Sequence, residues 1–315
     1  MTTFWIAFAL KATLWTAVIS AAVWMIPAQH PGLRRACALL GLWGVWLVPW
    51  LKIPTAAISA TVPSFNGVEI STHPGPWMNA LVAAWVIGSI ILLLRLSRES
   101  ASIARLVQNA RPERAHAGTT VEVRVSAEIE GPCMTGWWRP SVLLPQEALA
   151  WPAATLQAAL RHEEQHARQH DGLHRVCAAL LQAVFWWNPA VHLLCRIYEE
   201  ESEVCCDFEA SSTGVNRRQY GEMLLAHAMG MPGRALAMPF ARSTGLRGRI
   251  SRLLATTQPT QGLGSARWCA ALLLLAVAAV LAAAVRVETL TASDTHSLES
   301  EARLRLNADP FPGTP

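Results

Sequence analysis

The sequence predicts a mostly α-helical membrane protein, with four transmembrane helices and a helical cytoplasmic domain that carries a small β-hairpin or sheet. Three observations lead to this fold class. Of the 315 residues, 52% are hydrophobic and 15% are charged, whereas soluble domains carry about 25% charged residues. Several apolar segments are long enough to cross a bilayer. Fourteen tryptophans accompany two tyrosines, and tryptophan is enriched at membrane surfaces.

The same composition argues against other classes of protein. Disordered chains are polar and rich in charge, which this chain is not. No basic block is interleaved with aromatic residues, so we expect no nucleic-acid partner. The seven cysteines are scattered and form no C-x-x-C pair, which fits neither a disulfide framework nor a cysteine-type zinc module.

Four segments meet the requirement of about 20 mostly apolar residues for a membrane-spanning helix. They lie at about 4–26, 36–53, 77–94 and 268–285. The first could be a signal peptide, but no basic residue precedes it and its apolar run is too long. We therefore expect it to be a retained span.

The arginines indicate the orientation, because positive charge stays on the cytoplasmic side. Arg34 and Arg35 lie in the first loop, whereas the loop 52–76 has no arginine. More arginines follow the third span and precede the fourth. We expect the N-terminus outside, three spans within 1–96, a cytoplasmic domain at 97–267, the fourth span at 268–285 and a short extracytoplasmic tail at 286–315.

Within 97–267, the pattern predicts a linker helix, two short strands and then helices. The linker helix is expected at 97–110, the strands at 119–126 and 141–145, and a turn-rich connection at 131–136. Helices are expected at 153–170, 173–187, 190–210 and 217–229. The apolar stretch 176–197 could be a fifth span, but Asn188-Pro189 interrupts it, so we favour a helix pair buried in the domain.

The helix expected at 153–170 contains His162-Glu163-Glu164-Gln165-His166, which is an H-E-x-x-H motif. Histidines four residues apart share one helix face and can bind one zinc ion. Glu163 can then act as general base toward a water at the metal. His170 continues the spacing but lies about 12 Å along the helix from His162, too far to share the ion, so we expect a solvated or supporting residue there.

A catalytic zinc usually has three protein ligands, and the next helix offers carboxylates. Glu203 and Asp207 are four residues apart and share a face, so one could bind zinc while the other accepts the outer N–H of a zinc-binding histidine. The alternative is an ordinary acidic surface, which we expect for Glu199, Glu200 and Glu201. Cys205 and Cys206 could be soft metal ligands, but we expect them in a hydrophobic core.

Six motifs together resemble the peptidase family of the BlaR/MecR-type bacterial sensor-transducers, which are membrane-bound zinc metallopeptidases. In chain order they are GWWRPSVLLP at 136–145, HEEQHARQHD at 162–171, FWWNP at 185–189, EVCCD at 203–207, YGEMLLA at 220–226 and RGRISRLL at 247–254. The resemblance covers roughly residues 1–285, including the arrangement of three spans, a cytoplasmic domain and a fourth span.

The resemblance implies a gluzincin-like peptidase domain with one zinc ion per chain. Its ligands would be His162, His166 and Glu203, with Glu163 as general base and supporting roles for Asp207 and Asp171. It further implies a multi-pass protein of the bacterial cytoplasmic membrane that cleaves itself or a BlaI/MecI-like transcriptional repressor. A homodimer is left open. No residue is ranked as oxyanion stabiliser among Tyr198, Tyr220, His174 and His227.

Two features depart from the family pattern. First, Glu164 stands where an apolar residue is usual. Second, the sequence has no S-x-x-K motif of a penicillin-binding sensor domain, because the residues three before its two lysines are Phe8 and Pro49 and not serine. The alternative function is therefore a non-catalytic membrane transducer whose zinc domain binds a regulator. A transporter lacks support, because the charges gather in one insert and not in paired, broken spans.

Overall fold

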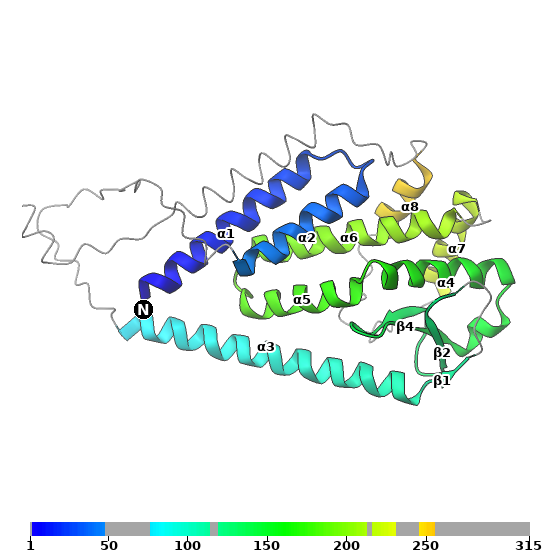
Figure 1. The fold of residues 1–315 in the computed structure, drawn as a ribbon, viewed down its shortest axis with the longest axis horizontal. Coiled ribbons are helices and arrows are strands. Elements are labelled where there is room, and N and C mark those ends of the chain that lie inside the picture. The colour runs from blue at the N-terminus through cyan, green and yellow to red at the C-terminus, as the bar shows by residue number, and fades with distance from the viewer. Residues whose placement is uncertain (1, 48–75, 114–118, 213–215, 231–245, 256–315) are drawn as a thin grey trace, which may run out of the picture.

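The computed structural model describes residues 2–47, 76–113, 119–212, 216–230 and 246–255 (Figure 1). Over these residues the chain is mostly helical with one small sheet, which confirms the predicted fold class at that level. The fourth span expected at 268–285 and the tail expected at 286–315 lie outside the described residues.

Three helices form the N-terminal part: α1 (Thr2–Met25), α2 (Pro31–Leu47) and α3 (Pro76–Asn109). Of the described helices, α1 and α3 are long and apolar enough to cross a membrane. The second expected span continues beyond α2 into residues that are not described. α3 runs without a break through the boundary expected at 96–97, so the segments expected as the third span and the linker helix form one helix.

The sheet has four strands in the order β1-β2-β4-β3. They are β1 (Arg111–Pro112), β2 (Glu122–Ser126), β3 (Cys133–Thr135) and β4 (Ser141–Pro145). β2 pairs with β4 in parallel, and β3 pairs with β4 antiparallel, with Met134 opposite Val142. The turn-rich connection expected at 131–136 is therefore wrong in part, because its middle pairs with β4 as an edge strand.

A short 3-10 helix, η2 (Gln146–Ala150), leads from the sheet into five α-helices. They are α4 (Ala153–Arg168), α5 (Asp171–Val184), α6 (Pro189–Ser211), α7 (Arg217–Gly230) and α8 (Leu246–Leu254). α4 ends two residues before the expected limit, because His170 adopts a left-handed conformation with φ of 54°. Asp171 consequently begins α5 and does not end α4.

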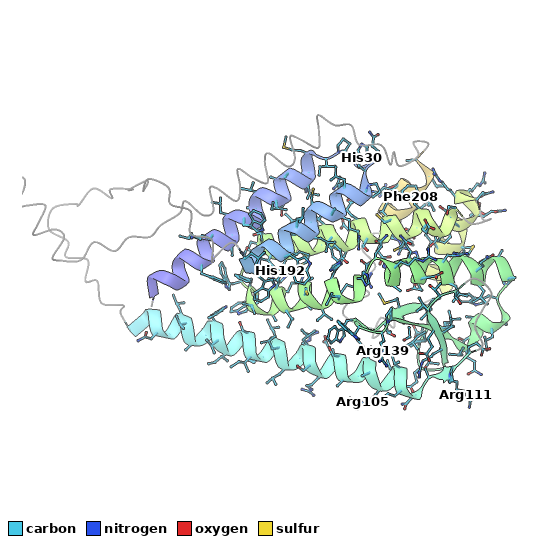
Figure 2. All side chains as sticks on the ribbon, in the orientation of Figure 1. His30, Arg105, Arg111, Arg139, His192 and Phe208 are labelled. Atoms are coloured by element: carbon cyan, nitrogen blue, oxygen red, sulfur yellow. The ribbon has the colours of Figure 1, made fainter. Side chains whose placement is uncertain are left out.

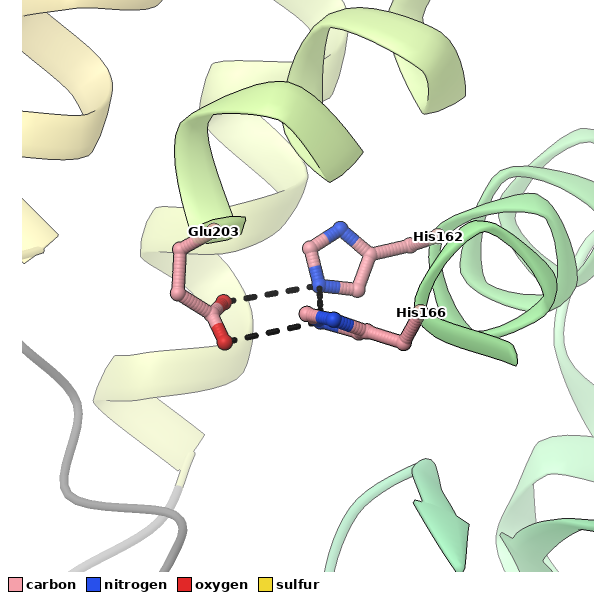
Figure 3. Close-up of side chains that lie close together, drawn as sticks. All are labelled: His162, His166 and Glu203. Carbon is pink, nitrogen blue, oxygen red and sulfur yellow. Dashed lines mark hydrogen bonds and ion pairs between the residues drawn. The ribbon is translucent and has the colours of Figure 1, made fainter. Parts of the chain in front are cut away.

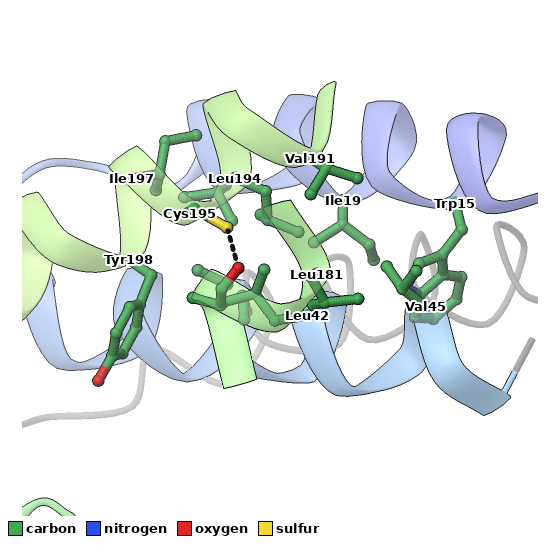
Figure 4. Close-up of a cluster of buried hydrophobic side chains, with 14 of the residues drawn as sticks. Trp15, Ile19, Leu42, Val45, Leu181, Val191, Leu194, Cys195, Ile197 and Tyr198 are labelled. Atoms are coloured by element: carbon green, nitrogen blue, oxygen red, sulfur yellow. Dashed lines mark hydrogen bonds between the residues drawn. The ribbon is translucent and has the colours of Figure 1, made fainter. Parts of the chain in front are cut away.

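The largest hydrophobic core joins the first two helices to the pair formed by α5 and α6 (Figure 4). Trp15 and Ile19 of α1 and Leu42 of α2 meet Leu181 of α5 and Leu194 of α6 in this core. Figure 1 shows α5 between α2 and α3, while α6 runs alongside α2. The stretch 176–197 is thus a helix pair, as favoured from the sequence, but its core is shared with α1 and α2 and not with the domain expected at 97–267. A second core lies between the sheet and α4.

Gly41 lies where α2 touches both α1 and α6. A Cβ there would come within 2.6 Å of Ile19 Cγ2 and 2.8 Å of Leu194 Cδ2. We expect Gly41→Ala to lower the stability of the purified full chain by about 1–3 kcal/mol, the usual cost of overpacking, measured by thermal unfolding in detergent. Gly32→Ala on the same helix is the matched control, because a Cβ at Gly32 meets nothing within 4 Å. Equal losses in the two variants would contradict this account of the packing.

Candidate metal centre

Two imidazoles from α4 and a carboxylate from α6 lie together in the interior (Figure 3). The Nε2 atoms of His162 and His166 are 3.3 Å apart. The two oxygens of Glu203 each lie 3.5 Å from one of these nitrogens, Oε2 from His162 and Oε1 from His166. The structure thus brings together the three residues that the sequence analysis offered as metal ligands.

These separations fit a tetrahedral zinc site. Ligand atoms about 2 Å from a zinc ion at tetrahedral angles are about 3.3 Å from one another. Here the two Nε2 atoms are 3.3 Å apart, and each lies 3.5 Å from a different oxygen of Glu203. Both histidines are buried, and Glu203 is partly exposed.

The outer nitrogens of both histidines face carboxylates. Nδ1 of His166 lies 2.7 Å from Asp171 Oδ2, and Nδ1 of His162 lies 3.3 Å from Asp207 Oδ1. Hydrogen bonds of this kind fix the ring orientation and leave Nε2 free for a metal. Burial lowers the pKa of His162, but its contacts with Asp207 and Glu203 outweigh burial and raise the pKa to about 10.

Asp171 connects the candidate metal centre to the N-terminal helices. Its carboxylate accepts hydrogen bonds from Tyr198 Oη at 2.6 Å and from the hydroxyl of Ser202, and it is fully buried. Arg35 of α2 donates to the same carboxylate at 2.6 Å. Burial raises the pKa of Asp171, but His166 and Arg35 outweigh it and hold the pKa well below the ordinary value. Asp171 therefore supports His166 as a charged carboxylate.

Two arginines neutralise Glu203. Arg175 of α5 donates to Oε1 at 3.0 Å, and Arg249 of α8 lies 3.0 Å from Oε2. Arg249 also makes a bidentate contact with Asp207, at 2.8 Å and 2.6 Å. Burial raises the pKa of Glu203, but the charges around it, led by His166, hold that pKa well below its ordinary value. The carboxylate is thus available as an anionic ligand.

Glu163 faces the free edge of the sheet. Its Oε2 accepts a hydrogen bond from the backbone N–H of Met134 at 2.6 Å. Met134 belongs to β3, the edge strand of the sheet. The carboxylate expected to act as general base therefore lies between the metal-ligand cluster and a strand whose outer edge is not paired within the sheet.

Glu164, the departure from the family pattern, has a structural explanation. Its Oε1 accepts hydrogen bonds from the backbone N–H of Thr120 at 3.1 Å and the hydroxyl of Thr120 at 2.6 Å, and Arg168 lies 3.2 Å away. Although burial raises the pKa of Glu164, these hydrogen bonds outweigh it and lower the pKa. Glu164 thus fastens α4 to the segment that precedes β2.

We expect Glu164→Leu to destabilise the protein by about 1–3 kcal/mol at neutral pH, because Thr120 loses its buried acceptor. Since the folded-state pKa of Glu164 is lowered, its contribution is complete above the ordinary pKa of glutamate and is lost as the pH falls through the lower value. Chemical unfolding at pH 7 and at acidic pH measures the difference between variant and parent. A difference that grows on acidification would contradict the assignment.

A second group of ligand atoms, from His166, Asp171 and Cys206, also lies within metal-binding distance. All three residues are buried, and Asp171 already contacts Arg35, Tyr198 and Ser202. Burial raises the pKa of the Cys206 thiol well above its ordinary value, so a thiolate ligand is disfavoured. This group therefore acts as hydrogen-bonding support for His166.

Other site residues depart from expectation. Glu201 was expected on a solvated face, but it is 1% exposed, because Arg34 of α2 and Arg252 of α8 each lie 2.8 Å from its oxygens. Among the unranked oxyanion candidates, Tyr198 bonds Asp171, and Tyr220 lies between His162 Nδ1 and Asp207. Both tyrosines therefore lie behind the ligands.

The two remaining oxyanion candidates are His174 and His227. His174 packs edge-on against Trp43 and Tyr198, on the side of Asp171 that faces α2. The side chain of His227 lies outside the described part of the chain. His170 is exposed, as expected for a residue that is not a ligand.

Comparison with known proteins gives one family match and several relatives. The family model described as BlaR1 peptidase M56 matches residues 69–253. The regulatory protein BlaR1 of Bacillus licheniformis is 26% identical over 163 residues, which are 47% of this chain and 27% of that protein. The methicillin resistance mecR1 proteins of Staphylococcus aureus and Staphylococcus epidermidis are each 20% identical over 162 residues, 46% of this chain and 28% of each relative. The match thus spans little more than a quarter of these relatives.

Proposed function

This chain belongs to the BlaR1 peptidase M56 family, and from that premise we propose that it is a membrane-embedded zinc endopeptidase of a signalling system. The observation that carries the proposal is the convergence of His162, His166 and Glu203 at separations that suit one zinc ion. Glu163 lies beside this cluster on the same helix. The outer nitrogens of both histidines are held by carboxylates, as in many zinc sites.

In this proposal different residues bind the metal, transfer the proton and orient the histidines during peptide hydrolysis. His162, His166 and Glu203 would hold a zinc ion, which would supply Lewis acidity to the scissile carbonyl and to the attacking water. The Glu163 carboxylate takes the proton from that water and delivers it to the leaving amine nitrogen. Asp207 and Asp171 keep the two imidazoles in the orientation that leaves each Nε2 free.

The edge strand β3 supports a mode of substrate binding. The Met134 N–H points from this edge to Glu163, so an extended peptide that adds to β3 would lie alongside the general base. Main-chain hydrogen bonds to an open sheet edge are a common way to bind peptides. The substrate class is then an extended polypeptide segment, and we propose a BlaI/MecI-like cytoplasmic repressor or a segment of this chain itself.

The proposal is tested with the purified full chain reconstituted in vesicles. Incubation alone and with a purified BlaI/MecI-type repressor should give defined fragments, identified by mass spectrometry, that disappear with a chelator and return with added zinc. A chain that binds zinc yet yields no zinc-dependent fragment from either substrate would favour the alternative, a transducer in which the domain only binds a regulator.

A further inference from the structure

The hairpin formed by α5 and α6 contains a long uncharged stretch. Between Arg175 and Arg196 the chain has no Asp, Glu, Lys or Arg, and His192 is its single titratable imidazole. The helices meet at Phe185-Trp186-Trp187-Asn188, where α5 ends and α6 begins. This stretch is long enough for one membrane span, but it is folded back on itself.

The tip of this hairpin contacts the middle of both apolar helices. Asn188 Nδ2 donates to Thr13 Oγ1 of α1 at 3.0 Å. Trp85 Nε1 of α3 donates to the Val184 carbonyl at 2.8 Å, and the Trp186 ring packs on Gly88, where a Cβ would come within 3.0 Å of it. Figure 1 shows the tip between α1–α2 on one side and α3 on the other.

These contacts fix how far the tip reaches along the apolar helices. At 1.5 Å per residue, Thr13 lies about 18 Å from the cytoplasmic end of α1 at Met25, and Gly88 lies about 10 Å from Arg95 of α3. The hydrocarbon core of a bilayer is about 30 Å thick, so its midplane lies about 15 Å from either surface. Two independent helices thus place the tip near the midplane.

Side chains satisfy backbone hydrogen-bonding groups at the break between α5 and α6, as a lipid environment requires. Irregular backbone at membrane depth is tolerated where protein groups satisfy it. Asn188 Oδ1 accepts from Ala190 N–H at 3.0 Å, His192 Nε2 bonds the Trp186 carbonyl at 3.0 Å, and Trp85 bonds Val184 as described. Figure 2 shows His192 among the N-terminal helices, far from Arg105 and Arg111 at the sheet end.

The outer face of the hairpin is apolar and open. Leu180, Trp186, Trp187 and Leu193 of the hairpin are 37–43% exposed, and Leu193 lines a groove together with Ala17 and Trp24 of α1. On α3, Ile87, Ile90 and Ile91 are also exposed. Arg196 and Glu200, 2.8 Å apart, form the first ion pair of α6 after this stretch. We propose that α5 and the first half of α6 form a re-entrant hairpin whose outer face contacts lipid acyl chains.

This arrangement places the metal centre at the cytoplasmic surface of the bilayer. Asp171, at the base of the hairpin, bonds both His166 and Arg35 near the cytoplasmic end of α2. The inference rests on α1 and α3 being membrane spans and not on peptidase activity. Its failure is therefore distinguishable from failure of the proposed function, which zinc-dependent cleavage tests separately.

Photocrosslinking to lipid tests the hairpin. The photoreactive residue p-benzoylphenylalanine replaces Leu193 of α6, Leu180 of α5 or, as matched control, Leu149 of η2, which is 50% exposed in the cytoplasmic domain. The full chain is irradiated in phosphatidylethanolamine–phosphatidylglycerol vesicles, and adducts are mapped by mass spectrometry.

We expect acyl-chain adducts at Leu193 and Leu180 to exceed those at Leu149 by about tenfold or more, since the midplane excludes headgroups. Adducts at the control level, adducts to headgroups alone, or crosslinks to a second copy of the chain would each overturn the proposal. Thermal unfolding of each variant confirms that it has kept the parental fold.

Discussion

Glu163→Gln should strongly slow cleavage while leaving zinc binding intact. The substitution keeps the size of the side chain and its ability to accept a hydrogen bond from Met134 N–H, but it removes the basic carboxylate. General acid–base catalysis contributes about 10²- to 10⁴-fold to rate, so we expect cleavage to slow by that factor. The measurement is fragment formation over time by the full chain in vesicles, with bound zinc quantified on the same samples.

Glu164→Gln is the matched control for that experiment, because it makes the same chemical change one residue along the same helix. Glu164 bonds Thr120 and Arg168 and takes no part in the proposed chemistry. Cleavage by this variant should stay within about threefold of the parent at a temperature where both are folded, since its cost falls on stability. Equal losses of rate in the two variants would show that Glu163 acts structurally and would refute its role as base.

Asp171→Asn should weaken zinc binding by about 10- to 100-fold, the usual cost of removing a carboxylate behind a zinc-binding histidine. Asp171 orients His166 through a 2.7 Å contact and is itself held by Arg35, Tyr198 and Ser202. The amide keeps the shape but lacks the charge that favours the Nδ1–H tautomer. Competition with a fluorescent zinc chelator measures the affinity.

Glu201→Gln controls for loss of a buried carboxylate. Glu201 also pairs with an arginine of α2, in this case Arg34, and is 1% exposed. Its ion pairs are with Arg34 and Arg252, away from the histidines. Its zinc affinity should stay close to that of the parent. If the Asp171→Asn variant binds zinc no more weakly than the Glu201→Gln variant, Asp171 does not support the metal centre.

The ligand cluster was predictable because its signal is largely local. The spacing of His162 and His166 sets their shared helix face, whereas Glu203 was singled out from the acidic residues of 199–207 mainly by the resemblance to the peptidase family. The boundary between α4 and α5 was less predictable, because the left-handed conformation of His170 is unusual for a residue other than glycine. The helix α5 therefore begins at Asp171, two residues before the start at residue 173 that the sequence pattern predicts.

The charges around the cluster could not be predicted, because their partners come from distant segments. Arg35 indicated membrane orientation in the sequence but contacts Asp171 in the structure. Arg175 and Arg249 meet Glu203 from α5 and α8, and no local pattern connects those helices. β3 was missed because three residues between glycine-containing turns carry too short an alternation to identify a strand.

X-ray absorption at the zinc edge of the purified full chain tests the central claim most directly. One zinc per chain, bound by two imidazoles and oxygen ligands at about 2.0–2.2 Å, is the result expected for His162, His166 and Glu203. That signal should be lost in Glu203→Ala and kept in Cys206→Ala. A sulfur ligand at about 2.3 Å, or a chain that binds no zinc, would contradict the assignment of this cluster as the metal centre.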